Sequence, residues 1–166
     1  RWLGLCPADD SRLERIPVPY ILITQHTEFP LANAIVPDVT GGMRTAAHSL
    51  SETGHRKIAV LEYRQRDEPS RFGPLCRYIE SVLGLDAVHH IYDGDPIRNL
   101  MADPQGVTGL IVPHCVYLRQ ALSDGQVSGF IDKQQVAVST FTTRGMDAGL
   151  PDWVERVEFD AAEIGW

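Results

Sequence analysis

The sequence lacks several features that mark whole classes of protein. Its 166 residues contain no apolar run close to the roughly 20 residues that a membrane-spanning helix needs. No stretch combines basic, apolar and small residues as a signal peptide does. There is also no GxGxxG, GxxxxGK[ST] or GxSxG motif, so no dinucleotide site, phosphate-binding loop or hydrolase nucleophile elbow is indicated. We therefore expect no membrane segment and no cofactor.

Basic residues are too few for a duplex-binding surface. The chain has 15 Lys and Arg against 22 Asp and Glu, which gives a formal net charge of −7. Proteins that bind duplex DNA usually carry a basic stripe. The local basic groups, at residues 12–15 and 56–66, are interleaved with acids and are typical of a solvated face. We expect that this part of the chain does not bind DNA by itself.

Cysteine is also scarce. Cys6, Cys76 and Cys115 are odd in number, and no two of them have metal-ligand spacing. This favours buried free thiols in a reducing cytoplasm. His89 and His90 are adjacent on an expected strand, where their side chains point to opposite faces, so they predict no joint metal site.

What the sequence does have is an alternation of amphipathic segments with short apolar runs, shown best by residues 37–63. Helical spacing puts four residues on one face: Ala46, Ala47, Leu50 and Thr53. We predict a tight turn at residues 41–42, Thr40 as the helix N-cap, and Gly54 as the left-handed residue that ends the helix. Residues 58–61 then form an apolar run typical of a strand buried on both faces of a parallel sheet.

The same alternation continues along the chain. We predict further strands at 3–6, 20–24, 34–36, 88–92, 109–112, 136–139 and 154–159. We predict helical segments at 9–15, 71–83, 95–101 and 117–122, with another helix starting at 160. Residues 123–125 are expected to end a helix, and residues 62–70 to form a loop. The pattern predicts an α/β fold in which helices cover both faces of parallel sheets.

His114 and Cys115 directly follow the expected strand at 109–112. In α/β proteins, ligand contacts gather where parallel strands end. A nucleophilic Cys–His pair would also need a third group nearby to orient the base, and the sequence shows none. The hypothesis of an enzyme rests on these two residues alone, so we expect a protein that is not an enzyme.

One stretch resembles a known family. Asp38, Gly42, Ala46 and Leu50, followed by Gly54-His-Arg-Lys-Ile-Ala59, resemble a hallmark of the lactose/galactose-repressor family of bacterial transcription regulators. Weaker matches follow in the same order and cover nearly the whole chain: Ile16–Pro19, Arg71 with the helix that stops at Gly84, Thr108–Val112, Val136–Phe141 and Val154–Gly165.

The resemblance implies a periplasmic-binding-protein-like fold of type I, with two α/β lobes, three crossovers and a ligand in the cleft. On this alignment, residues 1–53 belong to an incomplete first lobe, residues 54–150 form the second lobe, and residues 151–166 cross back to the first. The implied protein is a cytoplasmic homodimer that senses a small-molecule effector. It contacts DNA only through a helix-turn-helix headpiece that is absent from this chain.

The resemblance also implies a ligand site made of Thr24, Arg71, His114 and Thr142. Sugar-binding members carry acidic or amide residues at three of these strand ends, whereas this chain has threonines and histidine. Losing carboxylates removes the acceptors that best hold sugar hydroxyls. The ligand is therefore a sugar or sugar-like molecule, an anion drawn to Arg71, or absent. The alternative is a solute-binding protein of a transport system with the same fold.

Overall fold

The computed structural model of this chain describes residues 22–23, 34–35, 38–63, 72–92, 96–102, 106–145 and 149–160. These residues fall in two compact units, 1–38 and 39–166, which we describe separately. In the first unit, β1 (Leu22–Ile23) pairs in parallel with β2 (Ala34–Ile35). Both short strands lie within segments that the sequence predicts to be strands.

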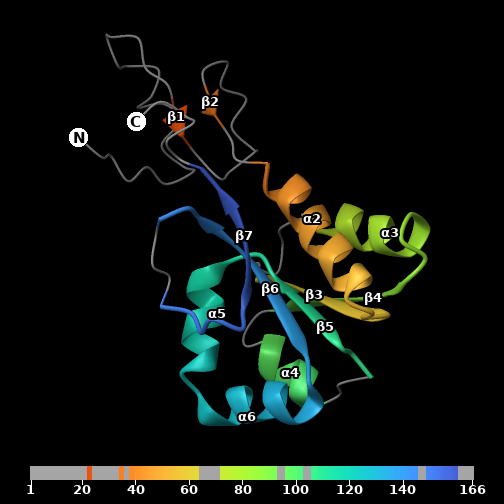
Figure 1. The fold of residues 1–166 in the computed structure, drawn as a ribbon, viewed down its shortest axis with the longest axis vertical. Helices are drawn as coiled ribbons and strands as arrows, with labels where there is room; N and C mark the ends of the chain where they lie inside the picture. The colour runs from red at the N-terminus through yellow and green to blue at the C-terminus, as the bar shows by residue number, and fades with distance from the viewer. Residues whose placement is uncertain are drawn as a thin grey trace. The chain divides into compact units, whose positions relative to one another are not determined.

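The second unit is built on a parallel sheet of five strands in the order β4-β3-β5-β6-β7 (Figure 1). The strands are β3 (Lys57–Tyr63), β4 (Asp86–Tyr92), β5 (Gly109–Val112), β6 (Ala137–Thr143) and β7 (Glu155–Phe159). Every neighbouring pair is parallel. The carboxyl ends of all five strands therefore lie along one side of the sheet, which we call the carboxyl edge.

Helices cover both faces of this sheet. They are α2 (Val39–Glu52), α3 (Gly73–Ser81), α4 (Pro96–Ala102), α5 (Cys115–Leu122) and α6 (Gly125–Gln134). Successive side chains of β3 point to opposite faces of the sheet, so this strand contacts the helices on both sides. Ile58 and Val60 pack with α2 and α3, whereas Ala59 and Leu61 pack with α4, α5 and α6.

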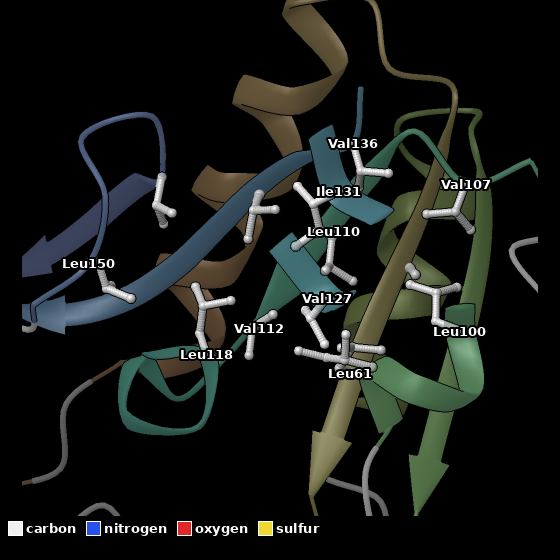
Figure 2. Close-up of a cluster of buried hydrophobic side chains, with 14 residues drawn as sticks. Leu61, Leu100, Val107, Leu110, Val112, Leu118, Val127, Ile131, Val136 and Leu150 are labelled. Atoms are coloured by element: carbon white, nitrogen blue, oxygen red, sulfur yellow. The ribbon is translucent and has the colours of Figure 1, made fainter. Parts of the chain in front are cut away.

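Figure 2 shows the cluster on the face of α4, α5 and α6, where Leu100, Leu118, Val127 and Ile131 meet Leu61, Leu110 and Val112 of the sheet. The predicted α/β class, with a parallel sheet and helices on both faces, is confirmed. None of the described helices is long and apolar enough to cross a membrane.

The helix predicted in residues 37–63 is present, with three differences. It begins at Val39, so Thr40 lies inside the helix and the prediction that it is the N-cap is wrong. Thr53 is exposed, and the buried face instead includes Met43. The third difference is that Gly41 and Gly42, which the sequence predicts to form a tight turn, are residues of the helix. Gly54 does end the helix in the left-handed region, at φ +94°, as predicted.

Gly42 is explained by packing. A Cβ atom placed on it would lie 2.5 Å from Cε2 of Phe141 and 3.4 Å from Cγ1 of Val157. The absence of a side chain is therefore what allows the first turn of α2 to lie directly on β6 and β7.

The sequence reading missed α6. Residues 123–125 were expected to lead from a helix to a strand, but Asp124 caps a new helix by accepting the backbone N–H of Gln126 at 2.9 Å. Val127 and Ile131, four residues apart, bury the inner face of this helix. The helical spacing of these two apolar residues is not evident in the sequence, because most of the other residues of the helix are polar and Gly129 lies between the two.

The larger compact unit begins at Val39 and includes α2. The sequence prediction placed α2, within residues 1–53, in the first lobe. In the structure α2 packs on β5, β6 and β7, strands that the prediction assigned to the second lobe and the crossover. The three-part division itself stays a prediction. The expected elements at 3–6, 9–15 and 160–163 fall outside the described residues, apart from Asp160.

Candidate functional site

Two of the four predicted ligand residues lie at the carboxyl edge. β5 and β6 are neighbours in the sheet, with Val112 paired to Thr140. His114 follows the end of β5, and Thr142 is the sixth of the seven residues of β6. The parallel topology therefore brings these two residues to the same edge. Thr24 and Arg71 lie outside the described residues.

The two residues differ in exposure. His114 has extended backbone angles at the N-cap position of α5 and is partly exposed. Its ring meets the ring of Tyr117 edge-on, with centroids 5.5 Å apart. Thr142 is 4% exposed. In this conformation His114 is the more accessible of the two to a small molecule.

A buried carboxylate–imidazole pair is the feature that sequence reasoning missed. Glu62, on β3, is 2% exposed, and its Oε2 lies 2.9 Å from Nε2 of His89 on β4. The sequence reading assigned Glu62 to a loop and weighed His89 only as half of a metal site with His90. The sequence does carry a signal for Glu62 alone, because it continues the alternation of Ile58 and Val60 and so extends the strand, but it carries none for the pairing with His89.

Cys76, on α3, lies near this pair. Burial raises the pKa of its thiol to about 11, helped by the negative charges of Glu80 and Glu62. At neutral pH the thiol is therefore protonated and a poor nucleophile. The expectation of a buried free thiol is confirmed for Cys76, whereas Cys115, also free, is only partly buried.

A groove of about 320 Å³ runs between α2 and α3. It is lined by Arg44, Thr45, His48, Ser49, Glu52 and Tyr78. The guanidinium of Arg44 sits 5.3 Å from the centre of the Tyr78 ring, and Nδ1 of His48 lies 3.5 Å from Oε1 of Glu52. These exposed groups of mixed charge largely pair with one another, and such surface pairs contribute only a few tenths of a kcal/mol.

The described residues contain no group of three His, Cys, Asp or Glu side chains placed to hold a metal ion. The described side chains at the carboxyl edge include those of Glu62, His114 and Thr142, which offer carboxylate, imidazole and hydroxyl groups for hydrogen bonding.

Comparison with known proteins gives one match. No protein-family model and no curated protein matches the chain. Among solved structures, it is similar to a transcription regulator like protein from Staphylococcus haemolyticus, with a TM-score of 0.54 and 15% sequence identity. The match covers 93% of this chain and 56% of the other, so this chain spans just over half of that protein's length. The likeness is one of fold, an α/β architecture with a parallel sheet.

Proposed function

We propose that this chain is the effector-sensing part of a bacterial transcription regulator, and that it binds a sugar or a sugar-like small molecule. The observation that carries the proposal is the structural likeness to a regulator-like protein over 93% of the chain. Two further facts support it. Hydrogen-bonding side chains gather at the carboxyl edge, where α/β folds bind ligands, and the residues that resemble the family hallmark extend from just before α2 to the start of β3.

In this proposal the protein is not an enzyme, and its output is a change of conformation. The effector binds in a cleft between two lobes and stabilises one closure state, because it has higher affinity for that state. That shift changes the geometry of a DNA-binding headpiece outside this chain, and the coupling is a free energy shared between the two sites. The working unit is a homodimer in the cytoplasm.

Thermal-shift screening of the full-length protein tests the proposal. Sugars, sugar phosphates and nucleosides are added one at a time, and a ligand at 100 times its Kd should stabilise the folded state by about 2.7 kcal/mol. The same compound should change the affinity of the protein for its operator DNA in a mobility-shift assay. If no compound stabilises the protein, or if a stabilising compound leaves DNA binding unchanged, effector sensing is ruled out.

The second candidate, a solute-binding protein of a transport system, has the same fold and the same kind of ligand site. Any residues encoded upstream of Arg1 discriminate the two. A helix-turn-helix there supports regulation, and a signal sequence or lipid-attachment motif supports transport.

Two simpler measurements test the remaining parts of the proposal. Sedimentation equilibrium should give twice the mass of one full-length chain, and a monomer would remove the homodimer. Iodoacetamide should label Cys115 no faster than an ordinary thiol, because a catalytic cysteine reacts as its thiolate. Faster labelling would revive the hypothesis of an enzyme.

A further inference from the structure

The pair formed by Glu62 and His89 lies across two neighbouring strands, on the face covered by α2 and α3. Val60 is the register partner of His89, and Glu62 lies two residues beyond Val60 toward the carboxyl edge. Val60 and Ala87 both pack in the cluster of α2 and α3, and alternate residues share a face, so Glu62 and His89 point to that same side. Figure 1 shows α2 and α3 on this part of the sheet.

The direction of the hydrogen bond follows from the chemistry of a carboxylate. The side chain of Glu62 is 2% exposed and that of His89 is 19% exposed. An ionised Glu62 has no proton to donate, so its carboxylate oxygens can only accept hydrogen bonds. Nε2 of His89, 2.9 Å away, therefore carries a proton and donates it to Oε2. The ring is then held in one tautomer and one orientation.

The other ring nitrogen becomes available as a result. With Nε2–H donated to the carboxylate, Nδ1 of the neutral imidazole is a hydrogen-bond acceptor. His89 is the more exposed member of the pair, so a small molecule reaches the ring rather than the carboxylate. A carboxylate that accepts from one ring nitrogen fixes the tautomer and orientation of the imidazole, as it does for metal-bound histidines, and so fixes the direction in which the second nitrogen points.

Stability alone does not account for the pair. A buried polar pair is a weak stabiliser, because the cost of removing both groups from water offsets most of the gain from their hydrogen bond. Covalent catalysis does not account for it either. Cys76, the thiol near Glu62, stays protonated at neutral pH. No third metal ligand joins the pair among the described side chains.

We propose that His89 is a ligand-contact residue of the effector site, that it accepts a hydrogen bond from a hydroxyl or N–H group of the effector, and that Glu62 is its positioning residue. This inference rests on the proposed function. It narrows the group that contacts His89 to a hydroxyl or N–H donor. The negative charge of Glu62 behind the ring disfavours a phosphate at this position, which favours a free sugar or a nucleoside over a phosphorylated sugar.

The first experiment reads the tautomer. Two-dimensional ¹⁵N–¹H spectra of the histidine rings in the full-length protein should show His89 protonated at Nε2. In Glu62→Gln the Nε2–H tautomer should lose its dominance. An Nδ1–H tautomer in the wild-type protein would overturn the role given to Glu62.

The second experiment measures affinity with four probes: glucose, ribose, adenosine and glucose 6-phosphate. At least one uncharged probe should bind, and His89→Phe, which keeps the ring volume but has no acceptor, should weaken its binding about tenfold. His89→Gln retains a donor and an acceptor and should recover part of the loss. Asp124→Asn alters the ion pair of Arg98 and Asp124, which joins α4 to the start of α6, and serves as the control with unchanged affinity.

The outcomes separate the inference from the proposed function. If no probe binds the wild-type protein, both are overturned. If an uncharged probe binds equally well to wild type and to folded His89→Phe, only the inference is overturned. If glucose 6-phosphate alone binds, the ligand class is wrong and effector sensing stands. Far-UV circular dichroism verifies folding, and His89→Gln carries the test if His89→Phe does not fold.

Discussion

Gly42→Ala and Gly129→Ala should change the stability of this chain in opposite directions. Both glycines lie within helices, in α2 and α6. A Cβ on Gly42 would lie 2.5 Å from Cε2 and 2.7 Å from Cδ2 of Phe141. Phe141 is 7% exposed, and its ring stacks on Phe159 with centroids 5.5 Å apart, so it has little room to move. A Cβ on Gly129 meets no atom within 4 Å.

The magnitudes follow from two competing terms. Alanine is favoured over glycine by about 1 kcal/mol in a helix interior, which is the whole effect expected at Gly129. At Gly42 a smaller gain, in the first turn of the helix, is set against about 1–3 kcal/mol for forcing a methyl group into a filled core. We expect Gly42→Ala to lower the free energy of unfolding by about 1 kcal/mol or more. Phe141→Leu should relieve the clash, so the double variant should be more stable than the sum of the single effects.

Urea and thermal unfolding followed by far-UV circular dichroism measure both changes. A difference of 1 kcal/mol corresponds to roughly 2–4 °C in Tm for a chain of this size. The refuting result is a Gly42→Ala variant that is as stable as Gly129→Ala. It would mean that α2 shifts freely on β6 and that contact with Phe141 does not fix its position.

Three further predictions concern single side chains. Ser139→Ala should raise the free energy of unfolding by about 1 kcal/mol, because Oγ of Ser139 is buried without a partner. Thr140→Val should lower it by about 1 kcal/mol, because Oγ1 of Thr140 donates a hydrogen bond to the carbonyl of Val112 at 2.6 Å. Equal urea midpoints for the two variants would refute this contrast. The buried thiol of Cys76, whose pKa is raised from 9.0 to about 11, should stabilise the fold fully below pH 9, with the contribution lost as pH rises from 9 to 11, since the unfolded chain loses the proton first. Cys76→Ala should flatten that part of the pH–stability curve, and an unchanged slope would contradict the assignment. Arg71→Ala should weaken binding of an effector by about tenfold or more if the arginine makes a charge-assisted bond, and unaltered affinity in isothermal titration would remove Arg71 from the site.

The parts of the fold that sequence predicted well are those where one residue pattern decides the structure. The apolar run 109–112 is short and bounded by turn signals, which favours a buried strand over a helix, and β5 has those bounds. Gly54 ends α2 because its φ of +94° is open to glycine and costly for other residues. The helix α6 was missed because its cap, Asp124, also reads as a turn residue, and only the packing of Val127 and Ile131 decides between the two.

The site was predicted in part for a similar reason. Topology alone brings His114 and Thr142 to one edge, since any residue that follows a parallel strand lies there. The pair of Glu62 and His89 depends on the register of β3 against β4 across 27 positions of the chain. A single sequence carries no signal for that register, so each residue was assigned from its neighbours and the pair was missed.

This pair changes the argument about the ligand. On sequence alone the site has lost its carboxylates, which leaves open a sugar-like molecule, an anion drawn to Arg71, or no ligand. In the structure the carboxylate of Glu62 lies near the carboxyl edge, but it is hydrogen-bonded to His89, so a ligand would contact the imidazole and not the carboxylate. A phosphate is best bound by an arginine guanidinium, which can donate two parallel hydrogen bonds to it. A hydroxyl donor is best bound by a neutral acceptor whose direction is fixed. Recognition of an anion therefore depends on Arg71, and recognition of a hydroxyl on His89. Because the two demands fall on different residues, an effector whose affinity responds to His89→Phe and not to Arg71→Ala is held through a donor group at His89 and not through an anionic group at Arg71.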